Sequence, residues 1–325
     1  MTSPIADLTY RNYDGPLAPA KMRWWVIAKM TMRMALKKKS MWVAMAFSAW
    51  YYLCMIFVLF FIDQFGQSNS RPGQPNPAAS FIGRLVWKDQ FLHGFAFGQI
   101  MFLVITLIIG AGAIANDNRA NALLVYLSKP CTKTDYLFGK WVGIFIPLFA
   151  TMVIPSLVFF GYGALSYRDQ GFLWQDPWVF PKLICMLALG AILHSSLIIG
   201  FSSMFNQGRI AGATYAGVYF LSNFFTQLMT SLWIMNQGGR RNQHEIPPAA
   251  YATLSKLYYA SIDGVNIGMA KAILGTNGTP PFGIPGGLKP VPHPNLPAIV
   301  AIALAISAVS LFVAWTRIKA VEVVG

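Results

Sequence analysis

Charged residues are scarce in this chain. Asp, Glu, Lys and Arg make up 11% of its 325 residues, against about 25% in soluble domains, which excludes an ordinary soluble protein. Apolar residues make up 55%, and a membrane span needs about 20 of them in succession. Six segments of this length contain none of the four charged types: 41–62, 91–115, 141–165, 183–205, 210–235 and 296–316. The sequence therefore predicts an all-α integral membrane protein with six transmembrane helices.

Motifs for catalysis and cofactor binding are also missing. The three cysteines, Cys54, Cys131 and Cys185, share no motif spacing, so we expect neither a disulfide framework nor a metal site. The chain has no GxxxxGK[ST] loop for phosphate, no HExxH, no GxSxG and no pair of carboxylates placed for acid and base work. We therefore predict that the chain is not an enzyme and carries no cofactor of its own.

The predicted spans lack the charged groups that usually couple ion movement to a change of shape. Four polar residues are the candidates for lining a substrate pathway: Gln99, His194, Asn223 and Gln227. His194 can contact substrate, or it can be a neutral imidazole that bonds to a neighbouring helix. We favour the second interpretation, because buried polar side chains commonly join helices in lipid. Asn223 and Gln227 share a helix face, so they can line a cavity or bond to a neighbour.

The net charge of +14 is distributed as a signal of membrane topology. With both termini in the cytoplasm, 15 of the 25 Lys and Arg residues lie on the cytoplasmic side, eight of them before the first span. This bias follows the positive-inside rule. We therefore expect cytoplasmic termini, contact with anionic membrane lipid and no nucleic-acid partner.

The chain divides into two predicted regions. Residues 1–40 form a cytoplasmic arm and an amphipathic interfacial helix, in which the cations mostly avoid the side that carries the tryptophans; a plain extension of the first span is the alternative. Residues 41–325 form the six-span domain, with a cytoplasmic coupling segment at 116–140 and an outer loop at 236–295. Helical spacing in that loop predicts one or two short helices at the outer interface.

The segment 116–140 separates two apolar runs with a mixed, polar sequence. Its spacing predicts a short helix over 118–127 with leucines on one side, ended by Pro130. A second helix begins near Thr132, whose hydroxyl caps it together with Asp135. Such an element can pass the motion of a soluble partner to the spans on either side. The alternative is a plain helical loop, whose cations only satisfy the positive-inside rule. The candidate coupling residues are Asn118, Arg119, Leu123, Leu124, Leu127, Lys129, Pro130, Lys133 and Asp135.

The same segment carries an ordered motif, which runs through Asn121–Leu127, Ser128–Pro130, Thr132–Lys133, Asp135–Tyr136 and Gly139–Lys140. This order and spacing resemble the cytoplasmic signature of ABC-2 type permeases, the membrane subunits of a class of ATP-binding-cassette exporters. The stretch FSSMFNQGRIAGATYAG, residues 201–217, is similar to that family's small-residue, basic turn between the fourth and fifth spans. The chain departs from the signature at Asn121 and Ala122, where the family usually has Gly-Thr.

The resemblance implies the ABC-2 permease fold and transport, by export, across a bacterial cytoplasmic (inner) membrane. It implies a separate ABC ATPase subunit, which hydrolyses ATP and docks on the coupling segment. It also implies a second permease copy in a homodimer, or a paralogue in its place. The resemblance leaves the substrate open. A structural or assembly subunit of a membrane complex, which transports nothing, is the alternative function.

Overall fold

The computed structural model describes residues 22–68, 81–122, 131–238, 248–279 and 291–318, and these ranges contain helices and turns but no strand. The predicted all-α fold is thus confirmed for this part of the chain. The longer helices are α1 (Arg23–Leu36), α2 (Lys39–Ser48), α3 (Trp50–Ser68), α5 (Trp87–Gly110), α8 (Lys133–Ser166), α10 (Val179–Met204), α11 (Gly208–Gly238), α13 (Ile262–Leu274) and α14 (Leu296–Arg317). The shorter elements are α6 (Ala115–Arg119), α9 (Phe172–Gln175), α12 (Pro248–Lys256) and the 3-10 turn η2 (Leu257–Ala260).

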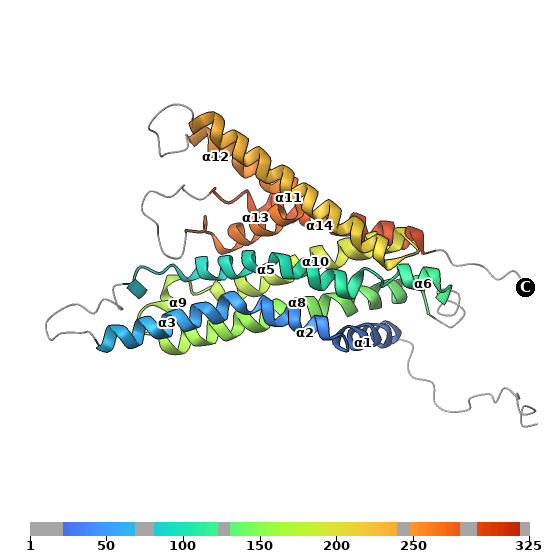
Figure 1. Ribbon diagram of the computed structural model, residues 1–325, viewed down its shortest axis with the longest axis horizontal. Helices are drawn as coiled ribbons and strands as arrows, with labels where there is room; N and C mark the ends of the chain where they lie inside the picture. Colours follow the sequence, from blue (N-terminus) through green and yellow to red (C-terminus); the bar gives the residue numbers. More distant parts are fainter. Residues whose placement is uncertain (1–21, 69–80, 123–130, 239–247, 280–290, 319–325) are drawn as a thin grey trace, which may run out of the picture.

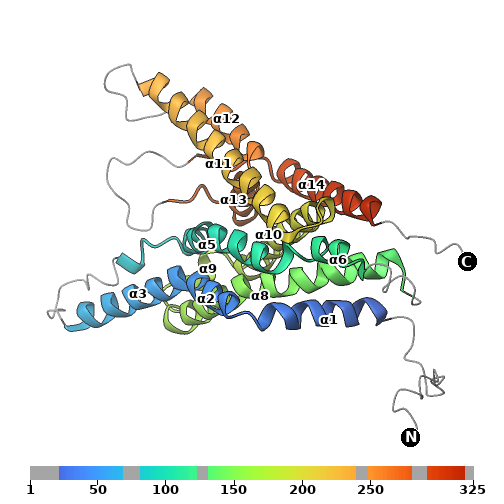
Figure 2. The same cartoon turned by 45° about the vertical axis from the view of Figure 1, so that its right-hand side comes forward.

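The long helices run back and forth along one axis, in the order α2–α3, α5, α8, α10, α11 and α14 (Figures 1 and 2). Among the described residues, four stretches are long and apolar enough to cross a membrane: Trp87–Arg119, Lys133–Ser166, Val179–Met204 and Leu296–Arg317. The bent pair α2 and α3, which meet at 41°, makes a fifth if it counts as one span. The predicted span 210–235 lies in the 31-residue α11, which is long enough but also carries several amide and hydroxyl side chains. The six predicted spans are therefore confirmed only in part.

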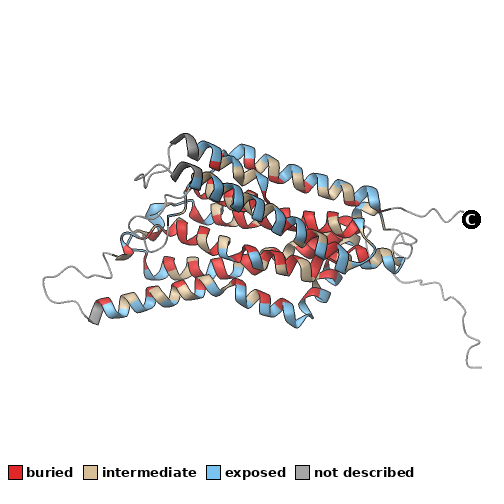
Figure 3. Ribbon diagram, turned by 45° about the horizontal axis from the view of Figure 1, so that its top comes forward, coloured by how far each residue is buried: buried red, intermediate tan, exposed pale blue. Residues whose placement is uncertain are grey.

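The buried centre of the bundle lies between α5, α8 and α10. Phe91 and Phe102 of α5 are fully buried, and their rings contact Phe159 of α8 and His194 of α10 respectively. Buried residues follow the inward faces of the helices, and exposed ones cover the outward faces (Figure 3). Many exposed side chains are large and apolar, such as Phe224, which is 64% exposed. An outer surface of this kind is suited to hydrocarbon rather than water.

The helix α13 is one of the short helices expected within 236–295, and it lies inside the bundle. It packs against α5, α10, α11 and α14, and Asn266, Met269 and Ala270 are fully buried. At 13 residues it is about 20 Å long and too short to span a membrane. The spacing in the outer loop correctly indicated helix, but periodicity alone could not show that this helix packs among the spans.

The helix α1 lies alongside the first half of α8 (Figures 1 and 2). Gly139 permits this contact, because a Cβ atom there would lie 2.5 Å from the backbone oxygen of Trp24. The ring of Trp24 meets that of Phe138 edge-on at a centroid distance of 4.9 Å. The helix predicted within 21–40 is therefore present, and it is joined to α8 by close packing.

Candidate functional site at the junction of α6 and α8

A break in the helix separates α5 from α6. The Ser202 side chain of α10 forms hydrogen bonds with the backbone at this break. The Ser202 hydroxyl accepts hydrogen bonds from the amides of Ile114 and Ala115 and donates one to the carbonyl of Ala111, each at 3.0 Å. These bonds satisfy backbone groups that the end of α5 and the start of α6 leave without helical partners. Ser202 is fully buried, so a single side chain holds α6 onto α10.

On its other side, α6 is joined to α8 by Asp117. The carboxylate of Asp117 lies 2.8 Å from the Lys140 ammonium and accepts a hydrogen bond from the Tyr136 hydroxyl at 2.6 Å. Lys140 and Tyr136 are both buried, and a buried cation requires a partner of opposite charge. We call Asp117, Tyr136 and Lys140 the Asp117 cluster.

The start of α8 has the predicted cap. The Asp135 amide donates to the Thr132 hydroxyl at 3.1 Å, and the Thr132 amide donates to the Asp135 carboxylate at 3.2 Å. This reciprocal pair is the capping box expected from the sequence, and that prediction is confirmed. Lys133 is the first residue of α8 and is half-buried.

The helix predicted over 118–127 is interrupted. Asn118 and Arg119 lie in α6, but α6 ends at Arg119, and Asn121 has a φ of 51°. This left-handed conformation ends a helix, and asparagine adopts it more readily than most residues. Glycine adopts it more readily still, which explains how Asn121 can stand where the family usually has glycine. Leu123, Leu124, Leu127, Lys129 and Pro130 lie outside the described residues.

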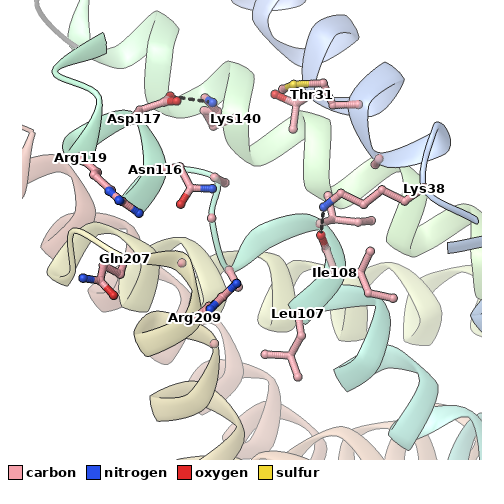
Figure 4. A pocket seen from close by; sticks show the side chains of 18 of the residues that line it. Thr31, Lys38, Leu107, Ile108, Asn116, Asp117, Arg119, Lys140, Gln207 and Arg209 are labelled. Atoms are coloured by element: carbon pink, nitrogen blue, oxygen red, sulfur yellow. Dashed lines mark hydrogen bonds and ion pairs between the residues drawn. The ribbon is translucent and has the colours of Figure 1, made fainter. Parts of the chain in front are cut away.

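A cavity of about 1000 Å³ opens beside the Asp117 cluster. Its walls come from the turn between α1 and α2, the end of α5, α6, the start of α8 and the start of α11. Figure 4 shows the ion pair of Asp117 and Lys140 at its edge, with Arg119 on the same helix as Asp117 and Arg209 below them in this view. The sequence identified Arg209 only as part of a short turn and identified Asp117 not at all.

Two of the pathway candidates, Gln99 and His194, belong to one buried network. The Asn266 amide donates to the Gln99 oxygen at 3.1 Å and to the Nε2 atom of His194 at 2.8 Å. The Nδ1 atom of His194 bonds to the Tyr215 hydroxyl. His194 thus links α10 to α11 and α13, which confirms the interpretation of an imidazole bonded across helices. Asn266 was missed because it lies outside the predicted spans.

The other two pathway candidates, Asn223 and Gln227, differ in burial. Asn223 is half-buried and bonds to Tyr219, whereas Gln227 is exposed on the outer face of α11. Tyr219 also bonds to Asp263 at the start of α13. Burial raises the pKa of the Asp263 carboxyl from 3.8 to about 6, against the lowering effect of the Tyr219 bond. The shared helix face therefore does not place Asn223 and Gln227 in one site.

The fold and this junction together define a class of protein: a multi-pass, all-helical membrane protein in which a short helix between two spans is bonded to both α8 and α10. The model of a family described as ABC-2 family transporter protein matches residues 25–312, and the chain therefore belongs to that family. Its members are membrane subunits of transporters and are not themselves catalytic. No curated protein matches the chain. The resemblance carried by residues 121–140 is thus confirmed by a match over most of the chain.

Proposed function

We propose that this protein is the permease subunit of an ABC exporter in a bacterial cytoplasmic membrane, driven by ATP hydrolysed in a separate ATPase subunit. The chain has no phosphate-binding loop of its own, so the energy comes from a partner. Of the permease's surfaces, the end of the bundle with α6 is the one where the ATPase docks. The supporting observation is that α6 is bonded on both sides, to α10 through Ser202 and to α8 through Asp117.

These two attachments give the proposed coupling a physical route. A displacement of α6 by the ATPase reaches α8 through the ion pair of Asp117 and Lys140, and it reaches α10 through the Ser202 hydroxyl. The ATPase end is cytoplasmic in this proposal, in keeping with the 15 of 25 Lys and Arg residues on that side of the predicted topology. A second permease copy completes the transporter as a homodimer.

Co-purification tests this function. The full chain, tagged and expressed together with the ATPase encoded next to it, is expected to retain that ATPase and to show ATP hydrolysis in lipid vesicles. Leu123→Asp places a charge in the apolar part of the coupling segment and is expected to abolish both. Leu165→Asp is the matched control, because Leu165 lies at the opposite end of α8 and is 88% exposed. A wild-type chain that binds no ATPase would instead support an assembly subunit.

A further inference from the structure

The cavity beside the Asp117 cluster has an excess of positive charge. Its charged lining residues are Lys38, Asp117, Arg119, Lys140 and Arg209. Asp117 and Lys140 neutralise each other, which leaves three cations. Within the described ranges, neither Arg119 nor Arg209 makes an ion pair or a side-chain hydrogen bond. In Figure 4 both side chains extend toward the open middle of the cavity, where the Asn116 amide also lies.

The cations come from separate parts of the chain and are held together by close backbone contact. A Cβ atom on Gly208 would lie 2.8 Å from the Cα atom of Gly112, so the turn before α11 rests directly on the break after α5. Lys38 reaches the same place from the turn between α1 and α2, where its ammonium donates to the Ile108 carbonyl. The start of α11 also lines the cavity, and the amino end of a long helix favours an anion.

Most of the remaining wall of the cavity is apolar, apart from Thr31 and Gln207. Met34, Leu107, Ile108, Ala213 and Ala216 line it, so one cavity offers cations to a head group and hydrocarbon to a tail. Its volume of about 1000 Å³ is at the upper end of the range for sites that bind small molecules. These two kinds of wall together favour an amphiphilic anion over a small inorganic one.

The cavity also lies at the level expected of lipid head groups. Trp42 follows Lys38 by one helical turn, is 55% exposed and donates its indole hydrogen to the Leu36 carbonyl. Exposed tryptophans with one bonded polar atom are typical of the boundary between hydrocarbon and water. Lys38, one turn before Trp42, is therefore expected near that boundary.

We propose that this cavity binds the phosphate head group of an anionic phospholipid. The guanidinium groups of Arg119 and Arg209 hold the phosphate oxygens, which suit the planar fork of arginine. Lys38 and Asn116 lie at the sides of the head group, and the acyl chains follow the apolar wall along Leu107. This places a lipid site at the junction proposed for coupling, and it requires no ATPase, so it stands or falls separately from the proposed function.

Lipid binding by the purified full chain tests this site. The chain is stripped of lipid in neutral detergent and titrated with phosphatidylglycerol, phosphatidylcholine or inorganic phosphate, and bound molecules are counted by native mass spectrometry. Phosphatidylglycerol is expected to bind and phosphatidylcholine is not. Arg119→Gln and Arg209→Gln should each weaken binding by about fivefold, and the double variant should bind more weakly than either single variant. Arg317→Gln is the matched control, because Arg317 is an exposed arginine at the same end of the bundle that does not line the cavity.

A second pair of variants changes the shape of the cavity and keeps its charge. Ala213→Phe fills the cavity and is expected to weaken phosphatidylglycerol binding at least tenfold, by excluding the ligand. Val218→Phe, an exposed position on the same helix outside the cavity, should bind as the wild type does. Inorganic phosphate that displaces the lipid at equal concentration would overturn the lipid assignment. Wild-type binding by both the double arginine variant and Ala213→Phe, or an equal loss in Arg317→Gln, would overturn the site.

Discussion

The two ends of the bundle stabilise a carboxylate in different ways. At the α6 end, Asp117 is paired with Lys140 and bonded by Tyr136. At the opposite end, Asp89 near the start of α5 is 1% exposed and has no cation within ion-pair distance among the described residues. Asp89 instead accepts hydrogen bonds from the hydroxyls of Thr276 and Thr279 and from the Thr279 amide.

The Asp89 end of the bundle is closed by internal hydrogen bonds, whereas the α6 end is open to a ligand. Lys88 and His93 of α5 also bond to the segment after α13, at the carbonyls of Gly275 and Thr279, so several internal bonds tie that end of α5 to this segment. The α6 end keeps Arg119 and Arg209 free to meet a ligand. A carboxylate bonded to hydroxyls and amides fixes a structure, whereas a single ion pair beside unpaired cations leaves a surface that can bind and respond.

The largest expected effect is at the closed end. Asp89→Ala removes three hydrogen bonds to the carboxylate, each worth about 1.5 kcal/mol, and is expected to lower the free energy of unfolding by about 4.5 kcal/mol. Denaturant titration in mixed micelles measures the change. Asp176→Ala is the comparison variant, because Asp176 is 14% exposed and its partner Lys182 is 34% exposed, and its other bond is a single one from the Trp178 amide, so it should cost clearly less than Asp89→Ala. Equal losses in the two variants would remove the distinction between the ends.

At the α6 end, the cost should depend on which partner is removed. Asp117→Asn leaves the Lys140 ammonium, only 5% exposed, without a counter-charge, and is expected to cost about 3 kcal/mol. Lys140→Met leaves Asp117 20% exposed and still bonded to Tyr136, so it should cost less. The double variant Asp117→Asn/Lys140→Met should be more stable than Asp117→Asn alone. Additive losses in the same titration would show that the pair is not coupled.

A pH dependence should come from Asp263, between the two ends. The folded-state pKa of its carboxyl is about 6, above the ordinary 3.8, so the folded chain binds more protons than the unfolded chain in this range. The contribution of Asp263 to the free energy of unfolding is therefore greatest below about pH 4. It falls by about 2 kcal/mol as the pH rises to about 6. Asp263→Asn should remove this fall. Measuring both chains from pH 4 to 7.5 isolates the group, because other titrations cancel in the difference; parallel curves would contradict the prediction.

The smallest expected effect tests how α1 is held. Gly139→Ala places a methyl group against the backbone of Trp24 and should cost about 1 kcal/mol, since overpacking outweighs the better helix propensity of alanine. Gly161→Ala, in the same helix with nothing near the added methyl group, should be neutral or slightly stabilising. Thermal unfolding of the two variants gives the comparison, and a stabilised Gly139→Ala would mean that α1 is not closely packed on α8.

Features set by neighbours in the sequence could be predicted, whereas features set by distant contacts could not. The capping box of Thr132 and Asp135 depends on residues three apart, and it was found. Asn266 reaches His194 from 72 positions away, and no local pattern indicates that contact. The interruption at Asn121 was missed because the leucine spacing favours a continuous helix, while the turn preference of one asparagine is a weaker signal. Asp117 was missed for a related reason: its partners Tyr136 and Lys140 lie 19 and 23 positions further along the chain, too far for helical spacing to indicate the contact.

The length of α8 has a mechanical consequence. Its 34 residues make a helix about 50 Å long, and the Asp117 cluster holds it near one end. In the coupling proposed above, a tilt of about 5° imposed there would shift the far end by about 4 Å for a helix that moves as one straight body across Pro147 and Pro155. Because Ser202 attaches α10 to the same short helix, both spans would turn together. Labels placed on α8 and α10 should keep their separation while each moves relative to α3.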